Sequence, residues 1–259
     1  MKTRSLINKL AKKFPKRIAK KYYDFPGLQT GKLKEETNTI LLCLDFDEIV
    51  MKFMEDMGLT DKVDLIITHH PFIFGTKYKV FQRDENKKKL CDKIDSYNIP
   101  IYSFHTNFDE GQDGMNDALT EALGLLDVKP LESDPMARGG RLPEPMDVVE
   151  FSKYAKKCFN VDYSLLLDYG KQKVSTIAIV GGGGWSSWKK AMEEGYDLYI
   201  SGDCPHHGRR DIISYHYNYL DMPHEIEKIF VKQMKKNIRK IDDTINVIVV
   251  DHEKLPKVI

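Results

Sequence analysis

Two adjacent histidines, His69 and His70, end an apolar run in the stretch ITHHPFIF, and His105 and Asp109 follow another apolar run in SFHTNFDEG. Imidazole and carboxylate groups without thiolates form a ligand set that suits Zn, Fe, Mn, Co or Ni. Neighbouring side chains on a strand point to opposite faces, but Pro71 favours a bend that can bring both imidazoles to one site. The alternative is a polar pocket that binds no metal.

The second half of the chain carries further imidazoles and carboxylates directly after its apolar runs: Asp203, His206, His207, Asp221, His224, Glu225 and Glu227. In a parallel sheet, ligands bind beyond the carboxyl ends of the strands, where these side chains are expected. The two groups together offer more donors than one tetrahedral ion needs. Two ions about 3.5–4 Å apart, bridged by a carboxylate and a hydroxide, use them most economically. His216 and His252 lack a comparable context, and we do not assign them to the site.

The elements that would position the first group alternate in type. Apolar runs predict strands, and helical periodicity predicts a helix after each: strands over 39–46, 63–70 and 99–107, and helices over 48–59, 86–97 and 115–125. This βαβαβα order favours a parallel sheet with right-handed crossovers. A stretch with several prolines and a glycine pair, 127–146, is interpreted as a connector. Two α/β domains are therefore expected, over 1–126 and 147–259.

The alternation of helices and strands resumes after the connector. Helices are expected over 147–159, 187–195, 207–217 and 224–238, and strands over 163–170, 174–184, 196–203, 219–222 and 245–251. Four glycines, Gly181 to Gly184, follow one of these strands and precede a helix. Such a turn can bind a phosphate or carboxylate through backbone N–H groups. It lacks the P-loop Lys-Ser/Thr and the dinucleotide-binding spacing, so a plain tight turn is an equally good interpretation.

The 259 residues include 40 Lys and Arg and 39 Asp and Glu, for a formal net charge of +1. This balance gives no reason to expect a nucleic acid or a membrane as partner. No apolar run approaches the roughly 20 residues of a membrane helix. The four scattered cysteines fit a reducing, cytoplasmic location.

Residues 1–21 carry nine Lys or Arg and no acidic residue. Their periodicity predicts an amphipathic helix with six side chains facing inward: Leu6, Ile7, Leu10, Phe14, Ile18 and Ala19. A transit peptide or an anion-binding arm is the alternative interpretation of this segment.

The chain resembles the NIF3-like dinuclear metal-centre proteins, which are also named as homologues of a type 2 GTP cyclohydrolase I. Five stretches carry the resemblance, in the order ITHHPFIF, FHTNFDEGQDGMNDALTEALGL, AIVGGGG, ISGDCPHH and DMPHEIEKIFV. The opening FPGLQTGKLKEETNTILLCLD also resembles the family's N-terminal segment. The resemblance covers nearly the whole chain. The length corresponds to the family's short form, without the domain that longer members insert.

This resemblance implies two intertwined α/β domains with mainly parallel sheets, two divalent metal ions per chain between the domains, and a ring-shaped homohexamer. The ligands it implies are His69, His70, Asp109, His224 and a glutamate just after His224. His105 would stand beside the metals, either as an outer residue that supports the ligands or as a proton shuttle. His207 would line the pocket, and Gly181, Gly182 and Gly183 would contact the substrate.

The last motif departs from the family pattern. Pro223 stands where glycine is usual, and Lys228 stands where the family glutamate is usual. Residues three apart on a helix share a face, so Glu227 is expected to be the bridging carboxylate, with Glu225 as the alternative. This departure affects the second metal site more than the first.

The function implied is that of a metal-dependent hydrolase acting on a small molecule. If the cyclohydrolase resemblance extends to activity, the electrophile is C8 of the guanine ring of GTP; a phosphoesterase would use the same ligands. The alternative is a non-catalytic metal-binding or regulatory assembly that binds partner proteins. Nucleic-acid binding is not expected, because only a local patch such as Lys87–Lys89 or the N-terminal helix could supply the charge.

Overall fold

The structure is a computed structural model that describes residues 1–259. The chain divides into two compact units: unit 1 contains residues 1–114 and 230–253, and unit 2 contains residues 115–229 and 254–259. The chain therefore leaves unit 1 and later returns to it, so the two units are intertwined along the sequence. These bounds differ from the expected division into 1–126 and 147–259, because the last helix and strand of the chain complete unit 1.

Unit 1 contains a five-stranded sheet in the order β1-β4-β3-β2-β11. Its strands are β1 (Gly27–Thr30), β2 (Thr39–Cys43), β3 (Leu65–Thr68), β4 (Ile101–Ser103) and β11 (Asn246–Val249). All neighbours pair in parallel except β1, which joins β4 antiparallel. Every residue of β3 and β4 is buried, as continuous apolar runs predict for strands covered on both faces.

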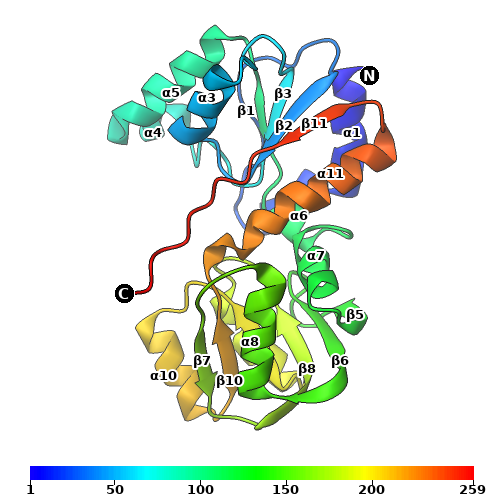
Figure 1. Cartoon of the computed structure of the whole chain (residues 1–259), viewed down its shortest axis with the longest axis vertical. Helices are drawn as coiled ribbons and strands as arrows, with labels where there is room; N and C mark the ends of the chain where they lie inside the picture. Colours follow the sequence, from blue (N-terminus) through cyan, green and yellow to red (C-terminus); the bar gives the residue numbers. More distant parts are fainter. The chain divides into compact units, whose positions relative to one another are not determined.

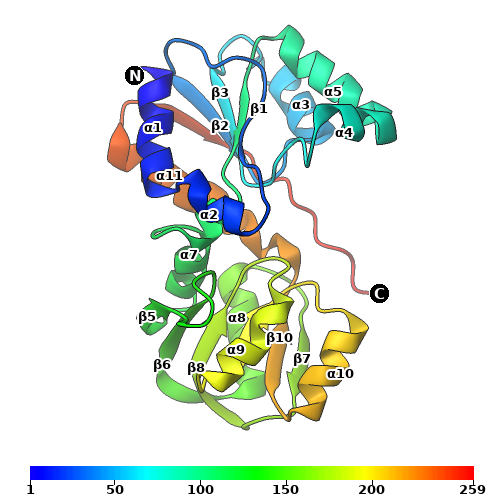
Figure 2. The ribbon, with the colours of Figure 1, turned by 180° about the vertical axis from the view of Figure 1, so that it is seen from behind.

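Helices cover both faces of this sheet. In both views, α3 (Glu48–Asp56), α4 (Lys77–Arg83) and α5 (Glu85–Ser96) lie on one side, and α1 (Thr3–Lys13) and α11 (Ile229–Ile241) lie on the other (Figure 1 and Figure 2). Two short helices, α2 (Lys16–Lys21) and α6 (Thr106–Glu110), complete the unit. Of the N-terminal segment, all six side chains expected to face inward are buried. The apolar inward side expected of residues 1–21 is therefore confirmed. The segment forms two helices and not one, because the backbone is extended at Pro15, directly before α2.

Unit 2 contains a six-stranded sheet in the order β5-β6-β8-β9-β10-β7. Its strands are β5 (Leu126–Pro130), β6 (Arg138–Asp147), β7 (Leu165–Asp168), β8 (Lys173–Ile179), β9 (Leu198–Ser201) and β10 (Asn218–Asp221). The three central strands β8, β9 and β10 are parallel, and the flanking strands are antiparallel. Five of the nine strand pairings in the two sheets are parallel. The prediction of an α/β fold with mainly parallel sheets is confirmed.

The stretch 127–146, expected to be a connector, instead forms most of β5 and β6. Gly139 lies in β6 because the ring of Tyr196 packs against the backbone there, and a Cβ would come 2.1 Å from that ring. Pro143 and Pro145 lie where the pairing of β6 with β8 is interrupted, so their missing N–H groups cost no ladder hydrogen bond. Glycine and proline, usual loop residues, have structural roles within this strand.

The helices of unit 2 also lie on both faces of their sheet. They are α7 (Met115–Ala122), α8 (Val148–Phe159), α9 (Trp188–Glu193) and α10 (His206–Ser214), with 3-10 turns η1 (Trp185–Ser187) and η2 (His224–Lys228). The helix α8 lies in front of the sheet in Figure 1, and α9 lies in front of it in the reverse view of Figure 2. The helix expected over 224–238 begins as the 3-10 turn η2 and continues as the α-helix α11. No helix of the structure is long and apolar enough to cross a membrane.

Candidate metal centre

Three histidines of unit 1 come together at the carboxyl ends of β3 and β4. His69 and His70 directly follow β3, and His105 comes two residues after β4. The centroid of the His69 ring lies 4.9 Å from that of His70 and 5.1 Å from that of His105. One ring nitrogen from each histidine lies within 4.8 Å of the others, close enough for all three to reach one metal ion. The parallel register of β3 and β4 aligns the two strand ends and so produces this cluster.

The backbone turns immediately after β3, which explains how two adjacent imidazoles reach the same site. The amides of His69 and His70 both donate hydrogen bonds to the carbonyl of Leu44, at 3.1 and 3.2 Å. The hydroxyl of Thr68 donates to the carbonyl of His70 at 2.8 Å. Consecutive residues that share one acceptor cannot continue an extended strand. The alternation of side chains between the two faces therefore ends at this position.

The Nδ1 atoms of His69 and His70 each face an oxygen that can only accept a hydrogen bond. His69 Nδ1 lies 2.9 Å from the carbonyl of Phe104, and His70 Nδ1 lies 2.7 Å from the carboxylate of Asp45. Nδ1 must therefore carry the proton in the neutral ring, which leaves the lone pair on Nε2. A histidine that ligates a metal through Nε2 shows this arrangement, because the hydrogen bond at Nδ1 fixes both the tautomer and the ring orientation.

His105 is held in the same way by Asp24, a buried carboxylate that follows α2. Asp24 Oδ2 accepts hydrogen bonds from His105 Nδ1 at 2.9 Å and from the hydroxyl of Thr106 at 2.7 Å, and Oδ1 accepts from the amide of Phe25 at 2.9 Å. Burial raises the pKa of the Asp24 carboxyl, but the hydrogen bond and charge of His105 together with the hydrogen bonds of Thr106 outweigh it and lower the pKa. Asp24 therefore stays ionised beside the imidazole.

Asp109 brings a carboxylate next to the histidine cluster. It lies in the short helix α6. Its backbone amide donates a hydrogen bond to the carbonyl of His105 and so links the two residues. Asp109 Oδ1 lies 3.4 Å from His69 Nε2. The rings of Phe108 and Phe230 pack around His69, with centroids 6.3 and 5.2 Å from its ring. His69 is fully buried, so an apolar wall limits access of water on that side.

Unit 2 contains a second pair of donors in the turn η2. His224 Nε2 lies 3.1 Å from the carboxylate of Glu227, and His224 Nδ1 lies 2.6 Å from the carboxylate of Asp203. The hydrogen bond and charge of Glu227, followed by those of Asp203, raise the pKa of His224 to about 9 although burial opposes the shift. His224 is therefore a cation at neutral pH when no metal is bound, and a metal ion would have to displace its proton. Glu227, not the alternative Glu225, contacts this histidine.

The glycine run after β8 packs closely against this pair. Gly182 has φ +58°, and a Cβ there would lie 2.3 Å from Glu227 Oε1 and 2.9 Å from His224 Nε2. The backbone amide of Gly181 donates a hydrogen bond to Asn116 Oδ1 at 2.8 Å, so this N–H group already has a partner within the protein. The run therefore works as a tight turn that makes room for His224 and Glu227. A substrate contact of Gly181, Gly182 and Gly183 stays a prediction.

His207 belongs to unit 2. It is exposed in the first turn of α10, and its ring centroid lies 5.5 Å from that of Trp185. No contact of His207 with His224 or Glu227 is observed, and its role in lining a substrate pocket stays a prediction.

Comparison with known proteins identifies the family. A family model for Duf34/NIF3 (NGG1p interacting factor 3) matches residues 1–256. The chain belongs to the Duf34/NIF3 family. Two members named GTP cyclohydrolase 1 type 2 homolog are similar in sequence. The one from Lactococcus lactis is 31% identical over 220 residues, which is 83% of each chain. The one from Clostridium perfringens is 30% identical over 264 residues, which cover 99% of this chain and 98% of that one.

Solved structures of NIF3-related proteins share the fold. A Bacillus cereus protein related to NIF3 matches with a TM-score of 0.87 at 20% identity, over 100% of this chain and 99% of that one. A Staphylococcus aureus hypothetical protein matches with a TM-score of 0.87 at 21% identity and the same coverage. The NIF3-like fold expected from the sequence motifs is confirmed.

Proposed function

We propose that this NIF3-family protein is a metal-dependent hydrolase with two divalent metal ions per chain. The ligands in this proposal are His69, His70 and Asp109 of unit 1 and His224 and Glu227 of unit 2. One observation carries the proposal: His69, His70, His105 and His224 all donate from Nδ1 to a carbonyl or carboxylate oxygen. Nε2 of each ring is thereby left as the metal-binding or proton-transferring atom.

The donor set fits a transition-metal pair. It consists of imidazoles and carboxylates and contains no cysteine, which suits Zn, Fe, Mn, Co or Ni. Each half holds at least one imidazole next to a carboxylate, His69 with Asp109 and His224 with Glu227. Outer carboxylates on ligating histidines raise the basicity of the ring and strengthen metal binding, a role open to Asp45 and Asp203. The proposal therefore gives a role to the carboxylates that hold Nδ1 of His70 and His224.

Two bound divalent ions would lower the pKa of a water molecule and so supply hydroxide near neutral pH. His105 is the residue available for proton transfer, because Asp24 holds its Nδ1 and leaves Nε2 facing the cluster. The hydrogen bond from Nδ1 to Asp24 would hold the His105 ring in one tautomer and orientation, as a carboxylate does for a general-base histidine. Phe108 and Phe230 keep one side of the cluster apolar, which strengthens its electrostatic interactions.

A nucleotide is the substrate class that the relatives favour, since those from Lactococcus lactis and Clostridium perfringens are named GTP cyclohydrolase 1 type 2 homolog. Hydrolytic opening of a purine ring at C8 and hydrolysis of a phosphoester would use the same ligands. In either case Gly181 to Gly183 and His207 are the proposed substrate contacts. The homohexameric ring implied by the family resemblance is part of the proposal.

The test combines turnover with metal analysis. The wild type, His70→Ala, His105→Ala and the control His216→Asn are assayed against a panel of nucleotides and phosphoesters. His216 lies outside the site, and asparagine tolerates its φ of +50°. We expect wild type and control to turn over one member of the panel, and both other variants to lose at least about 100-fold in kcat. Full metal content without turnover on the whole panel would reject the hydrolase and favour the non-catalytic assembly.

A further inference from the structure

The near-neutral net charge conceals a strong separation of charge along the chain. Residues 1–21 contain nine Lys or Arg, and α11 contains five, and neither segment contains an acidic residue. The whole chain has a formal net charge of +1, so the residues outside these two segments together carry a charge of −13. A separation of this size creates a local potential that the net charge does not reveal.

The two basic segments adjoin within unit 1. Lys13 at the end of α1 and Lys240 in the last turn of α11 both contact the carboxylate of Asp113, at 2.6 and 3.3 Å. Lys13 also donates to Asn237 of α11 at 2.6 Å. The helices α1 and α11 lie side by side in both views (Figure 1 and Figure 2). They therefore form one surface together with α2.

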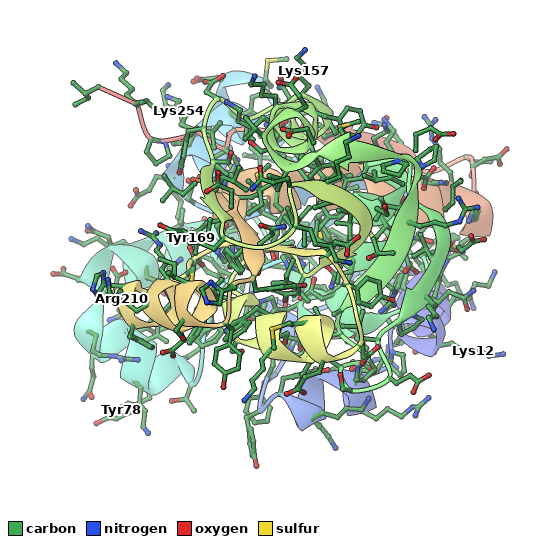
Figure 3. All side chains as sticks on the ribbon, turned by 90° about the horizontal axis from the view of Figure 1, so that it is seen from below. Lys12, Tyr78, Lys157, Tyr169, Arg210 and Lys254 are labelled. Atoms are coloured by element: carbon green, nitrogen blue, oxygen red, sulfur yellow. The ribbon has the colours of Figure 1, made fainter.

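We name this surface the basic face and define it by nine side chains that are exposed or half-exposed: Arg4, Lys9, Lys12, Lys16, Arg17, Lys20, Lys232, Lys235 and Arg239. Lys12 extends outward from the ribbon in the view from below (Figure 3). Several acids lie at the border of this face. Asp113 and Glu110 pair with lysines at its border, and Asp242 lies near Lys9.

A lysine-rich helix elsewhere in unit 1 shows a different pattern. In α5, Lys89 pairs with Glu85 at 3.0 Å and Lys93 pairs with Glu55 at 2.8 Å. By contrast, Lys12, Arg17 and Arg239 of the basic face have no carboxylate within 4.0 Å. Like charges gathered without counter-charges destabilise the folded state by mutual repulsion. A polyanionic partner would remove that cost, whereas a merely solvated helix face would not need such a separation of charge.

The apolar sides of the same helices argue against a lipid surface as the partner. Leu6 and Leu10 of α1 and Phe230, Met234 and Ile238 of α11 are fully buried within the protein. An amphipathic helix that lies in a membrane interface needs its apolar side for the lipid. Here only the charged side faces outward, which suits the phosphates of a nucleic acid backbone.

Two exposed aromatic side chains follow α2, as in proteins that bind single-stranded nucleic acids. Tyr23 and Phe25 come shortly after Lys20 and Lys21 in the chain and are 89% and 75% exposed. Tyr23 has φ +54°, which is rare for a bulky residue. Bases of a single strand stack on exposed aromatic rings while basic residues follow the backbone.

We propose that the basic face binds the phosphate backbone of a nucleic acid, with a single strand preferred. This inference is independent of the hydrolase proposal, and the basic side chains that carry it are not among the proposed metal ligands. RNA and DNA present the same phosphodiester chemistry to lysine and arginine, so the experiment includes both.

The test is fluorescence anisotropy of the full-length protein with labelled 20-nucleotide single-stranded RNA, single-stranded DNA and duplex DNA, at KCl concentrations between 50 and 200 mM. We expect binding that weakens steeply with salt, tighter for a single strand than for the duplex. Lys12→Glu/Arg17→Glu/Arg239→Glu should bind at least tenfold more weakly. Its slope of log K against log salt should be smaller by about 2, since each lost phosphate contact removes about 0.7.

The matched control is Lys79→Glu/Lys88→Glu/Lys89→Glu, which makes the same change of charge on exposed positions of α4 and α5. It should bind nearly as well as the wild type. The glutamine triple Lys12→Gln/Arg17→Gln/Arg239→Gln, expected to bind with intermediate affinity, separates a charge effect from misfolding. No binding at 50 mM KCl, or equal losses in the two glutamate triples, would overturn the proposal. Retention on vesicles with 30% phosphatidylserine but not on any nucleic acid would overturn it in favour of a membrane.

Discussion

Asp24 accepts a hydrogen bond from Nδ1 of His105 at 2.9 Å, although 81 residues separate them in the chain. The carboxylate is buried and is satisfied by donors from Phe25, His105 and Thr106. A fully hydrogen-bonded, ionised carboxylate holds an imidazole more firmly than a water molecule would. His105 is therefore fixed in one orientation, with Nε2 toward His69 and His70.

Asp24→Asn should lower turnover while leaving the metal content unchanged. The amide is a weaker acceptor and carries no charge, so His105 loses its fixed tautomer and orientation. We expect kcat to fall about 10–100-fold with little change in KM. Thr106→Val is the control, because it removes a hydrogen bond to the same carboxylate but leaves the one from His105. Equal losses of kcat in both variants would assign Asp24 a merely structural role.

Glu227→Ala should lose about half of the bound metal, whereas Glu225→Ala should not. Of the two glutamates, Glu227 contacts His224 and is buried, whereas Glu225 is half-exposed, and both lie in η2. The measurement is elemental analysis of both variants and the wild type after identical purification. The same metal content in all three proteins would contradict the assignment of Glu227 as a ligand.

Gly182→Ala tests whether the glycine turn makes room for this pair. A Cβ at Gly182 would lie 2.3 Å from Glu227 Oε1, and the residue has φ +58°. Gly195 is a matched control, with φ +85° and nothing within 4 Å of its Cβ position. The positive φ alone costs roughly 1–2 kcal/mol with alanine, so both variants should be destabilised by about that amount. Gly182→Ala should be destabilised further and should also bind less metal. Equal free energies of unfolding and equal metal contents would exclude the steric role.

His224 predicts how the stability of the metal-free protein depends on pH. Its pKa in the folded state is raised to about 9 by Glu227 and Asp203, above the usual value of about 6.5 in an unfolded chain. The folded state therefore holds the proton more tightly than the unfolded state does. The resulting stabilisation is fully present below about pH 6.5 and is lost as the pH rises through about 9. Urea unfolding in a chelator should show a decline over this range that is absent in His224→Gln. If the free energy of unfolding depended on pH in the same way in both proteins, His224 would not be the cause of the decline.

Much of the fold and of the histidine cluster could be predicted from the sequence. Continuous apolar runs at 39–46 and 63–70 predict strands buried on both faces, and parallel strands bring their carboxyl ends to one edge. His69, His70 and His105 are each within two residues of such an end, so their meeting follows from topology. Local sequence order was sufficient there because each histidine directly follows the element that positions it.

The features that could not be predicted depend on contacts between distant segments. Asp24 and Asp45 stand far along the chain from the histidines they hold, and a single aspartate in a loop carries no local pattern. The strand β6 was interpreted as a connector because Gly139 and two prolines are usual loop residues. Only the packing of Tyr196 on Gly139 and the interrupted pairing with β8 explain their presence in a strand.

Only part of the basic face could be predicted from the sequence. The basic character of residues 1–21 was evident, but a single amphipathic helix with lysines in water accounts for it. The contacts of Lys13 and Lys240 with the same carboxylate show that α11 adds its own basic residues to that surface. The two segments lie more than 200 residues apart in the chain.

Elemental analysis of the purified, untagged protein tests the central claim most directly. The proposed ligands predict close to two transition-metal ions per chain, either as purified or after reconstitution with Zn, Mn or Fe(II). The His70→Ala variant should hold fewer ions under the same conditions. No bound metal in the wild type after reconstitution would contradict the proposed centre. The hydrogen-bonded histidines would then form a polar pocket without a metal, the alternative that their residue types left open.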